Sequence, residues 1–289
     1  MRDTFIATTT ALLDDDPRTA LVLADISAES FAPARRRHPE RVLNVGIREQ
    51  LMASVAGGLA LTGLRPYLHS YAPFAVDRAY EQLKLDLGHQ DVGAVVVTIG
   101  GSYDAAAEGY THQSPGDVAL LDTLEGWTVH VPGHQDEVPA MLREAARHDD
   151  RVYVRLTEQQ NTRAYPDGGP LLVLRRGGPL VVAVGPMLDP VLEATTGLDV
   201  TVAYTNRPRP LDAGGLRALT EGDVVVVEPY LAGTSAAAVG SALGGVSHRV
   251  LHLGVGRSEI RRYGTWPDHA RAHGLDAPGL RASIVDFLG

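Results

Sequence analysis

Residues 41–61 read RVLNVGIREQLMASVAGGLAL and change their hydrophobic period at one glycine. The short apolar run at 41–44 is typical of a buried strand, whereas the apolar residues from Arg48 to Leu61 recur at intervals of three and four, as in a helix. Gly46 lies between the two patterns and predicts a turn. A strand that leads directly into a helix is the repeating unit of α/β proteins with parallel sheets.

The same alternation of short apolar runs and helical segments continues along the chain, so the predicted fold class is α/β. In the first half, strands are expected at 19–26, 41–44, 65–69, 93–99, 128–131 and 151–156, with helices at 48–61, 74–87, 117–124 and 135–148. In the second half, strands are expected at 171–174, 180–184, 200–204, 223–228 and 249–253, with helices at 189–195, 235–243 and 278–288.

A polar stretch containing Asn161, Pro166 and Gly168 separates these two halves and is typical of a linker. We therefore predict a first domain at 1–163, a linker at 164–170 and a second domain at 171–289, each domain with a mainly parallel sheet flanked by helices. A chain of 289 residues is long enough for two such cores.

The composition excludes several classes of function. The chain has 26 Lys and Arg against 35 Asp and Glu, a formal net charge of −9, which predicts no nucleic-acid partner and no binding to anionic membranes. It has no Cys, so thiolate nucleophiles and thiolate metal sites are excluded. No apolar run of about 18 residues and no leader pattern is found, which predicts a cytoplasmic protein without a membrane segment.

Three segments place chemically useful side chains at the junctions between strands and helices, where ligands bind in open α/β sheets. Glu49 lies in the first turn of a predicted helix, Tyr71 and Phe74 are spaced three apart, and Glu108 and His112 lie in a glycine-rich loop. Each also has a plain structural interpretation. A carboxylate complements a helix dipole, paired aromatics fill a core, and a polar loop residue flanks a helix.

Taken together, NVGIREQ at 44–50, FAVDRAYEQ at 74–82 and EGYTHQ at 108–113 resemble, in order and spacing, the pyrimidine-binding domain of transketolase-like thiamine-diphosphate enzymes. The resemblance covers residues 1 to about 165. The second half resembles the carboxy-terminal domain of the same family through Val226–Glu228 and the closing helix. The resemblance implies thiamine diphosphate as the cofactor.

It also implies roles for particular residues toward that cofactor. In the family, a glutamate at the position of Glu49 hydrogen-bonds a ring nitrogen of the aminopyrimidine and favours its imino form, which requires a carboxyl group shielded from water. Phe74 would stack on the aminopyrimidine with Tyr71 beside it. Asp25 and Ile26, at the end of the first expected strand, are further expected cofactor contacts.

Toward the substrate, the resemblance implies contacts from His112, Glu108 and Arg155, with Glu49 and His112 as the catalytic residues. The family's Gly-Glu before this motif is replaced by Ala106-Ala107, and a substrate histidine of sugar-phosphate transketolases aligns with Gly100. A phosphate-holding serine of the family falls near Glu29. These departures predict two-carbon ketol or related acyl transfer on a substrate other than a central sugar phosphate.

Full-length transketolases hold magnesium and the diphosphate with a Gly-Asp-Gly motif and a downstream Asn. In this sequence the only Gly-Asp pairs, at 116 and 222, are not followed by Gly. The resemblance is therefore to the C-terminal chain of a split transketolase. It implies a partner chain that carries the motif and holds Mg²⁺, in an α2β2 heterotetramer, with no metal ligands on this chain.

Three alternatives stay open at this level. The chain could be a 1-deoxyxylulose-5-phosphate synthase-like enzyme, the beta chain of a 2-oxo acid dehydrogenase, or a non-catalytic scaffold that keeps the fold. The first two share the glutamate and the two-domain layout. The retained Glu49, Phe74 and His112 argue against the scaffold.

Overall fold

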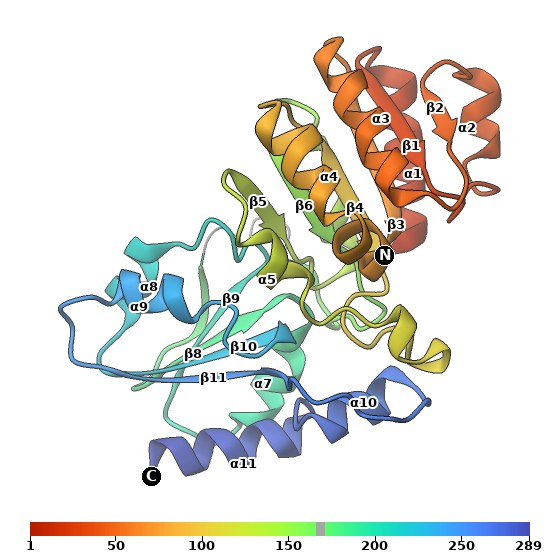
Figure 1. The fold of residues 1–289 in the computed structure, drawn as a ribbon. Helices are drawn as coiled ribbons and strands as arrows, with labels where there is room; N and C mark the ends of the chain where they lie inside the picture. The colour runs from red at the N-terminus through yellow and green to blue at the C-terminus, as the bar shows by residue number, and fades with distance from the viewer. Residues whose placement is uncertain (166–170) are drawn as a thin grey trace.

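The computed structural model describes residues 1–165 and 171–289, which form two α/β units joined side by side (Figure 1). The first unit has a six-stranded sheet with the strand order β2-β1-β3-β4-β6-β5, and all its pairings are parallel. Its strands are β1 (Thr19–Leu23), β2 (Val42–Asn44), β3 (Arg65–Tyr71), β4 (Val95–Ile99), β5 (Trp127–His130) and β6 (Arg151–Arg155).

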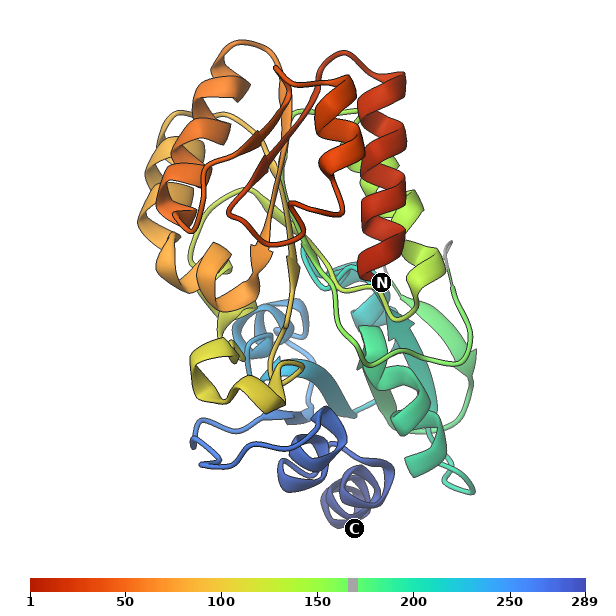
Figure 2. The same cartoon turned by 90° about the vertical axis from the view of Figure 1, so that its right-hand side faces the viewer.

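Helices cover both faces of this sheet, which is why its central strands are buried on both sides, mostly with apolar side chains. On one face Phe5 and Leu142 pack with Tyr67, and on the other Met52 and Leu83 pack with the strands. Figure 2 shows α1 (red) and α3 (orange) on opposite sides of the sheet. The helical segments are α1 (Arg2–Asp15), α2 (Ala32–Arg37), α3 (Glu49–Leu61), η1 (Pro73–Arg78), α4 (Tyr80–Gln82), η2 (Leu83–His89), η3 (Ala106–Glu108), η4 (Tyr110–His112), α5 (Asp117–Leu121), η5 (Gln135–Glu137) and α6 (Val138–Ala145).

The second unit has a five-stranded mixed sheet with the order β11-β10-β8-β9-β7, in which β7 runs antiparallel to β9 and the other pairs of the described strands are parallel. Its strands are β7 (Leu172–Arg175), β8 (Leu180–Val184), β9 (Thr201–Thr205), β10 (Asp223–Leu231) and β11 (Arg249–Val255). Its helical segments are η6 (Gly185–Met187), α7 (Leu188–Ala194), α8 (Ala213–Leu219), α9 (Ala236–Ala242), α10 (Trp266–Ala272) and α11 (Ala277–Leu288).

The predicted α/β class and the eleven predicted strands are confirmed. The sequence pattern missed four helices, α1, α2, α8 and α10, because their apolar stripes are thin; α1, for example, buries Thr8 and Thr9 beside its apolar residues. The helix expected at 74–87 is instead a short α-turn between two π-helical segments, η1 and η2.

The domain boundaries at 163 and 171 stay predictions. Most of the predicted linker, residues 166–170, lies outside the described residues. Within residues 1–165 and 171–289, no helix is long and apolar enough to cross a membrane.

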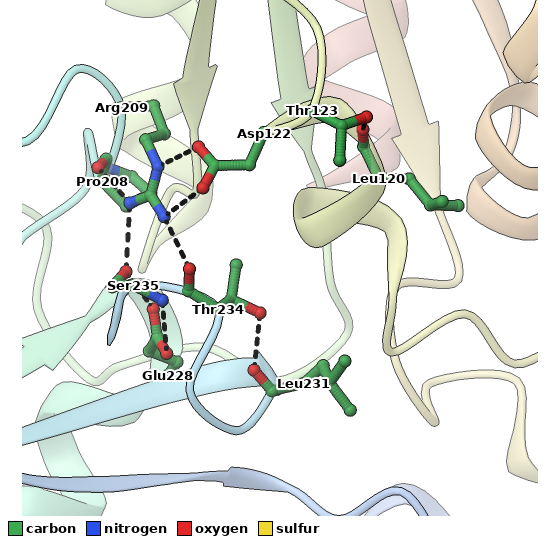
Figure 3. Close-up of polar contacts among 9 residues, drawn as sticks. All are labelled: Leu120, Asp122, Thr123, Pro208, Arg209, Glu228, Leu231, Thr234 and Ser235. Atoms are coloured by element: carbon green, nitrogen blue, oxygen red, sulfur yellow. Dashed lines mark hydrogen bonds and ion pairs between the residues drawn. The ribbon is translucent and has the colours of Figure 1, made fainter. Parts of the chain in front are cut away.

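The two units are joined by direct backbone and side-chain bonds. The amide of Leu231 donates to the carbonyl of Pro115 at 2.7 Å. Arg209, from the second unit, donates through Nη2 to Asp122 of the first unit at 3.1 Å and through Nη1 to Ser235 at 3.0 Å (Figure 3). The Ser235 hydroxyl in turn donates to the buried Glu228, whose pKa is raised by burial.

Glu137 is a second connected group at this junction and accepts four hydrogen bonds. Its Oε2 accepts from the amide of Gly133 at 2.9 Å, the hydroxyl of Tyr204 at 2.8 Å and Nδ2 of Asn206 at 3.0 Å, and its Oε1 accepts from the amide of Tyr165 at 2.8 Å. The side chain is fully buried. A buried carboxylate is tolerated only when its oxygens accept hydrogen bonds in this way, so these donors fix the second sheet against the first.

We expect Glu137→Ala to lower the free energy of unfolding by about 3 kcal/mol, because it leaves several buried donors without an acceptor. Denaturant unfolding followed by circular dichroism measures this loss. Glu144→Ala is the matched control: Glu144 pairs with Arg207 at the surface, and its removal should cost less than about 0.5 kcal/mol. Equal losses in the two variants would contradict the role assigned to Glu137.

Candidate functional site

Glu49 begins α3 directly after the turn at Gly46, which adopts a positive φ of 73°. Its side chain is only 1% exposed. Ser70 Oγ, on β3, donates to Oε1 at 3.1 Å, and Arg78 Nη1, at the end of η1, donates to Oε2 at 2.8 Å. The expected shielding of this carboxyl group from water is observed, and a cationic partner balances its charge.

Three rings lie beside each other next to this carboxylate; we call Tyr71, Phe74 and His112 the aromatic triad. Their centroids are 6.1 Å apart for Tyr71 and Phe74, 5.1 Å for Phe74 and His112, and 5.7 Å for Tyr71 and His112, all edge-to-face. Gly100 makes this packing possible, because a Cβ there would lie 2.3 Å from the Tyr71 ring. The structure thus brings together residues from β3, η1 and η4.

Arg78 connects the carboxylate to the triad. Its guanidinium carbon lies 4.3 Å from the centroid of the Phe74 ring while Nη1 bonds Glu49. Sequence reasoning gave Arg78 no role, although it was part of the quoted motif. Its spacing of four from Phe74, which puts the two side chains on one face of a helical turn, was the available signal.

Glu108 lies at the end of η3 and lines a cavity of about 690 Å³ that also borders Tyr71 and Gly100. Asp104 lines the same cavity, and the sequence gave no signal for it. Asp104 is buried and accepts from the amide of Glu158 at 2.9 Å. Burial raises the pKa of its carboxyl group to about 7.

Arg155 lies apart from this group. It is fully buried at the end of β6, where Nε donates to Asp117 at 2.7 Å and Nη2 donates to Ser102 at 2.6 Å. The backbone of Gly101 covers it, since a Cβ there would lie 2.6 Å from the guanidinium carbon. The contact of Arg155 with substrate stays a prediction that this geometry does not favour.

Asp25 and Ile26 follow β1 at the same edge of the sheet. Asp25 has a positive φ of 71°, held by Asn44, whose Oδ1 accepts from the Asp25 amide at 3.0 Å. Neither residue has a side-chain hydrogen bond to Glu49 or to the triad among the described residues. Their cofactor contacts stay predictions.

Glu49 and the aromatic triad together fit one half of a heteroaromatic cofactor. A buried carboxylate beside half-buried rings can hold a ring nitrogen and contact the ring itself at the same time. The carboxyl edge of a parallel sheet is also where such ligands bind in open α/β folds. The residues present therefore fit an aminopyrimidine, the part of thiamine diphosphate that the family's pyrimidine domain receives.

Comparisons with known proteins agree with this architecture. The family model described as transketolase, pyrimidine binding domain, matches residues 1–163. A solved structure described as a split gene transketolase, inactive beta4 tetramer, superimposes with a TM-score of 0.84 at 25% identity and covers 99% of this chain and 96% of that one.

Two curated relatives illustrate the range of similarity. An uncharacterized 33.6 kDa protein in the fasciation locus of Rhodococcoides fascians is 50% identical, over 99% of this chain and 94% of its own. The 1-deoxy-D-xylulose-5-phosphate synthase of Thioalkalivibrio sulfidiphilus is 31% identical over 94% of this chain, but the match spans only 44% of that synthase. The chain belongs to the transketolase-like family of thiamine-diphosphate enzymes and consists of its pyrimidine-binding domain followed by its C-terminal-like domain.

Proposed function

We propose that this chain is the pyrimidine-domain subunit of a two-chain, thiamine-diphosphate-dependent transferase of the transketolase type. The observation that carries the proposal is the buried Glu49 carboxylate next to the aromatic triad. The full-length similarity to a split gene transketolase supports a division of the enzyme into two polypeptides. The reaction proposed is transfer of a two-carbon ketol or related acyl unit to an aldehyde-type acceptor, in the cytoplasm.

Thiamine diphosphate, when bound, supplies the nucleophilic carbon for this chemistry. The chain's own residues would orient the cofactor and would hold or transfer protons. Glu49 would hydrogen-bond a pyrimidine ring nitrogen, with Ser70 and Arg78 fixing its two oxygens. Phe74 and Tyr71 would contact the ring, with Asp25 and Ile26 nearby. His112 Nδ1 pairs with Thr111 Oγ1 at 3.0 Å, which leaves Nε2 to contact the reacting oxygens of the substrate.

The partner chain would supply the Gly-Asp-Gly motif, the downstream Asn and the Mg²⁺ that hold the diphosphate. A magnesium diphosphate needs oxygen ligands in addition to the pyrimidine site described above. Two chains of each kind would form the active α2β2 assembly. The cofactor would then lie between the two polypeptides.

A second candidate is the chemistry of the deoxyxylulose-phosphate synthases, in which pyruvate is the donor. The 31% identity to one such synthase favours it. A donor comparison separates the two: consumption of pyruvate with loss of CO2 supports synthase-like chemistry, and consumption of a ketose supports ketol transfer.

We expect the chain to bind thiamine diphosphate with Mg²⁺ tightly only after its partner is added. The physical reason is that this chain would contact only the aminopyrimidine ring, whereas the complex would also hold the diphosphate of the same cofactor. Calorimetric titration of the chain, the partner and their mixture measures this. Tight binding and turnover by the chain alone would contradict the two-chain proposal, and no binding by the mixture would favour the scaffold.

We expect Glu49→Gln to lower the turnover of the reconstituted complex at least about 100-fold, because the amide cannot share a proton with the ring nitrogen. Circular dichroism and gel filtration check that the fold and the complex persist. Glu81→Gln, an exposed position of the same motif, is the control and should keep full activity. Unchanged turnover in Glu49→Gln would refute the proton role.

A further inference from the structure

The loop that carries His112 is closed at its base by its own backbone. It runs from the end of β4 to the start of α5, over residues 100–116. The amide of Ser102 donates to the carbonyl of Ser114 at 3.1 Å, and the amide of Ser114 donates back to the carbonyl of Ser102 at 3.0 Å. Loops whose ends lie this close are compact units that frequently carry functional residues. The position of His112 therefore depends on how this base is held.

Ser102 has a backbone conformation that a serine rarely adopts. Its φ is 55°, in the left-handed region, where residues with a side chain are strained. Strain of this kind persists only where the surrounding structure imposes it, and it is concentrated at functional sites. The side chain is only 3% exposed. The contacts that hold Ser102 are thus the contacts that hold the base of the loop.

The hydroxyl of Ser102 connects the two units. It accepts a hydrogen bond from Nη2 of Arg155 at 2.6 Å and donates one to the carbonyl of Pro229, on β10 of the second unit. Two positions further along β10, the amide of Leu231 donates at 2.7 Å to the carbonyl of Pro115, at the other end of the loop. One strand of the second unit therefore contacts both ends of the loop.

Arg155 joins the same two ends from the first unit. Its Nε donates at 2.7 Å to Oδ2 of Asp117, the first residue of α5. Both side chains are fully buried, so solvent ions screen this pair very little. A Cβ at residue 101 would lie 2.6 Å from the guanidinium carbon, so Gly101 allows the loop to pass directly over it. Arg155 thus supports the loop from behind, through Ser102 at one end and Asp117 at the other.

Ser114 connects the base of the loop to the segment that carries Phe74. Its Oγ donates to Oδ1 of Asp77 at 2.9 Å, and Asp77 lies on η1 between Phe74 and Arg78. The same loop bears His112, whose ring centroid lies 5.1 Å from that of Phe74. A shift at the base of the loop would therefore move His112 relative to the ring of Phe74.

We infer that Ser102 is a positioning residue for His112, because its hydroxyl holds the base of the loop between Arg155 and β10 of the second unit. The inference rests on the proposed function, in which His112 contacts the substrate. It gives the second unit and the buried Arg155 a part in the site without any contact to the substrate.

The first test measures the loop itself, in the chain without its partner. Hydrogen exchange of the amides at 103–113, followed by mass spectrometry, should be at least about 10-fold faster in Ser102→Ala than in the wild type, while the strands of the first sheet exchange as before. Ser102→Gly, which adopts a positive φ without strain but also lacks the hydroxyl, should show the same change. Ser247→Ala, at an exposed serine of the second unit, is the control. Unchanged exchange at 103–113 in either Ser102 variant would overturn the inference, as would equal acceleration throughout the chain.

The second test asks whether Ser102 acts through His112, in the complex reconstituted with its partner chain and with hydroxypyruvate as the donor. Ser102→Ala should lower kcat at least about 10-fold and leave the affinity for thiamine diphosphate nearly unchanged, because Glu49 and Phe74 keep their places. In a His112→Ala background the same substitution should lower kcat less than about 2-fold, since the ring through which Ser102 acts is then absent. Equal fold losses in the two backgrounds would overturn the inference. An inactive wild-type complex would instead contradict the proposed function, and the exchange measurement judges the loop separately.

Discussion

The burial of one carboxylate organises the first unit. Glu49 is removed from water at the start of α3, and a charge in that position needs donors on every open side. Ser70 supplies one from β3 and Arg78 supplies another from η1. Because Arg78 also lies over Phe74, the same ion pair helps to fix the Phe74 ring. The proposed catalytic group and the proposed ring contact are thus positioned by one interaction.

The junction between the units gives the site its outer wall. Glu137 and Arg209 hold the second sheet against the first, so Trp266 and its neighbours reach the cavity beside Tyr71. The second unit has no catalytic group in our proposal. Its contribution to the described cavity is the segment Gly264–Pro267, which forms one side of it.

In the proposed function this chain carries one part of the cofactor site. One carboxylate and a group of rings suffice to hold a planar heterocycle, whereas a magnesium diphosphate needs a second set of ligands. The family membership and the likeness to a split gene transketolase give this division a precedent in another protein. The departures from the family motif at Gly100 and Ala106-Ala107 leave Glu49 and the triad in place.

The sequence by itself determined the α/β class and the eleven strands, because hydrophobic periods are local properties. The resemblance of its motifs to a known family implied that Glu49, Tyr71, Phe74 and His112 belong to one site. Only the tertiary structure showed that Arg78 pairs with Glu49, that Arg155 is sealed behind Gly101, and that Asp104 opens into a cavity. These facts depend on contacts between segments distant in the chain. Local apolar patterns predict which segments are buried, but they do not show which charged side chains are buried with them or how those charges are paired.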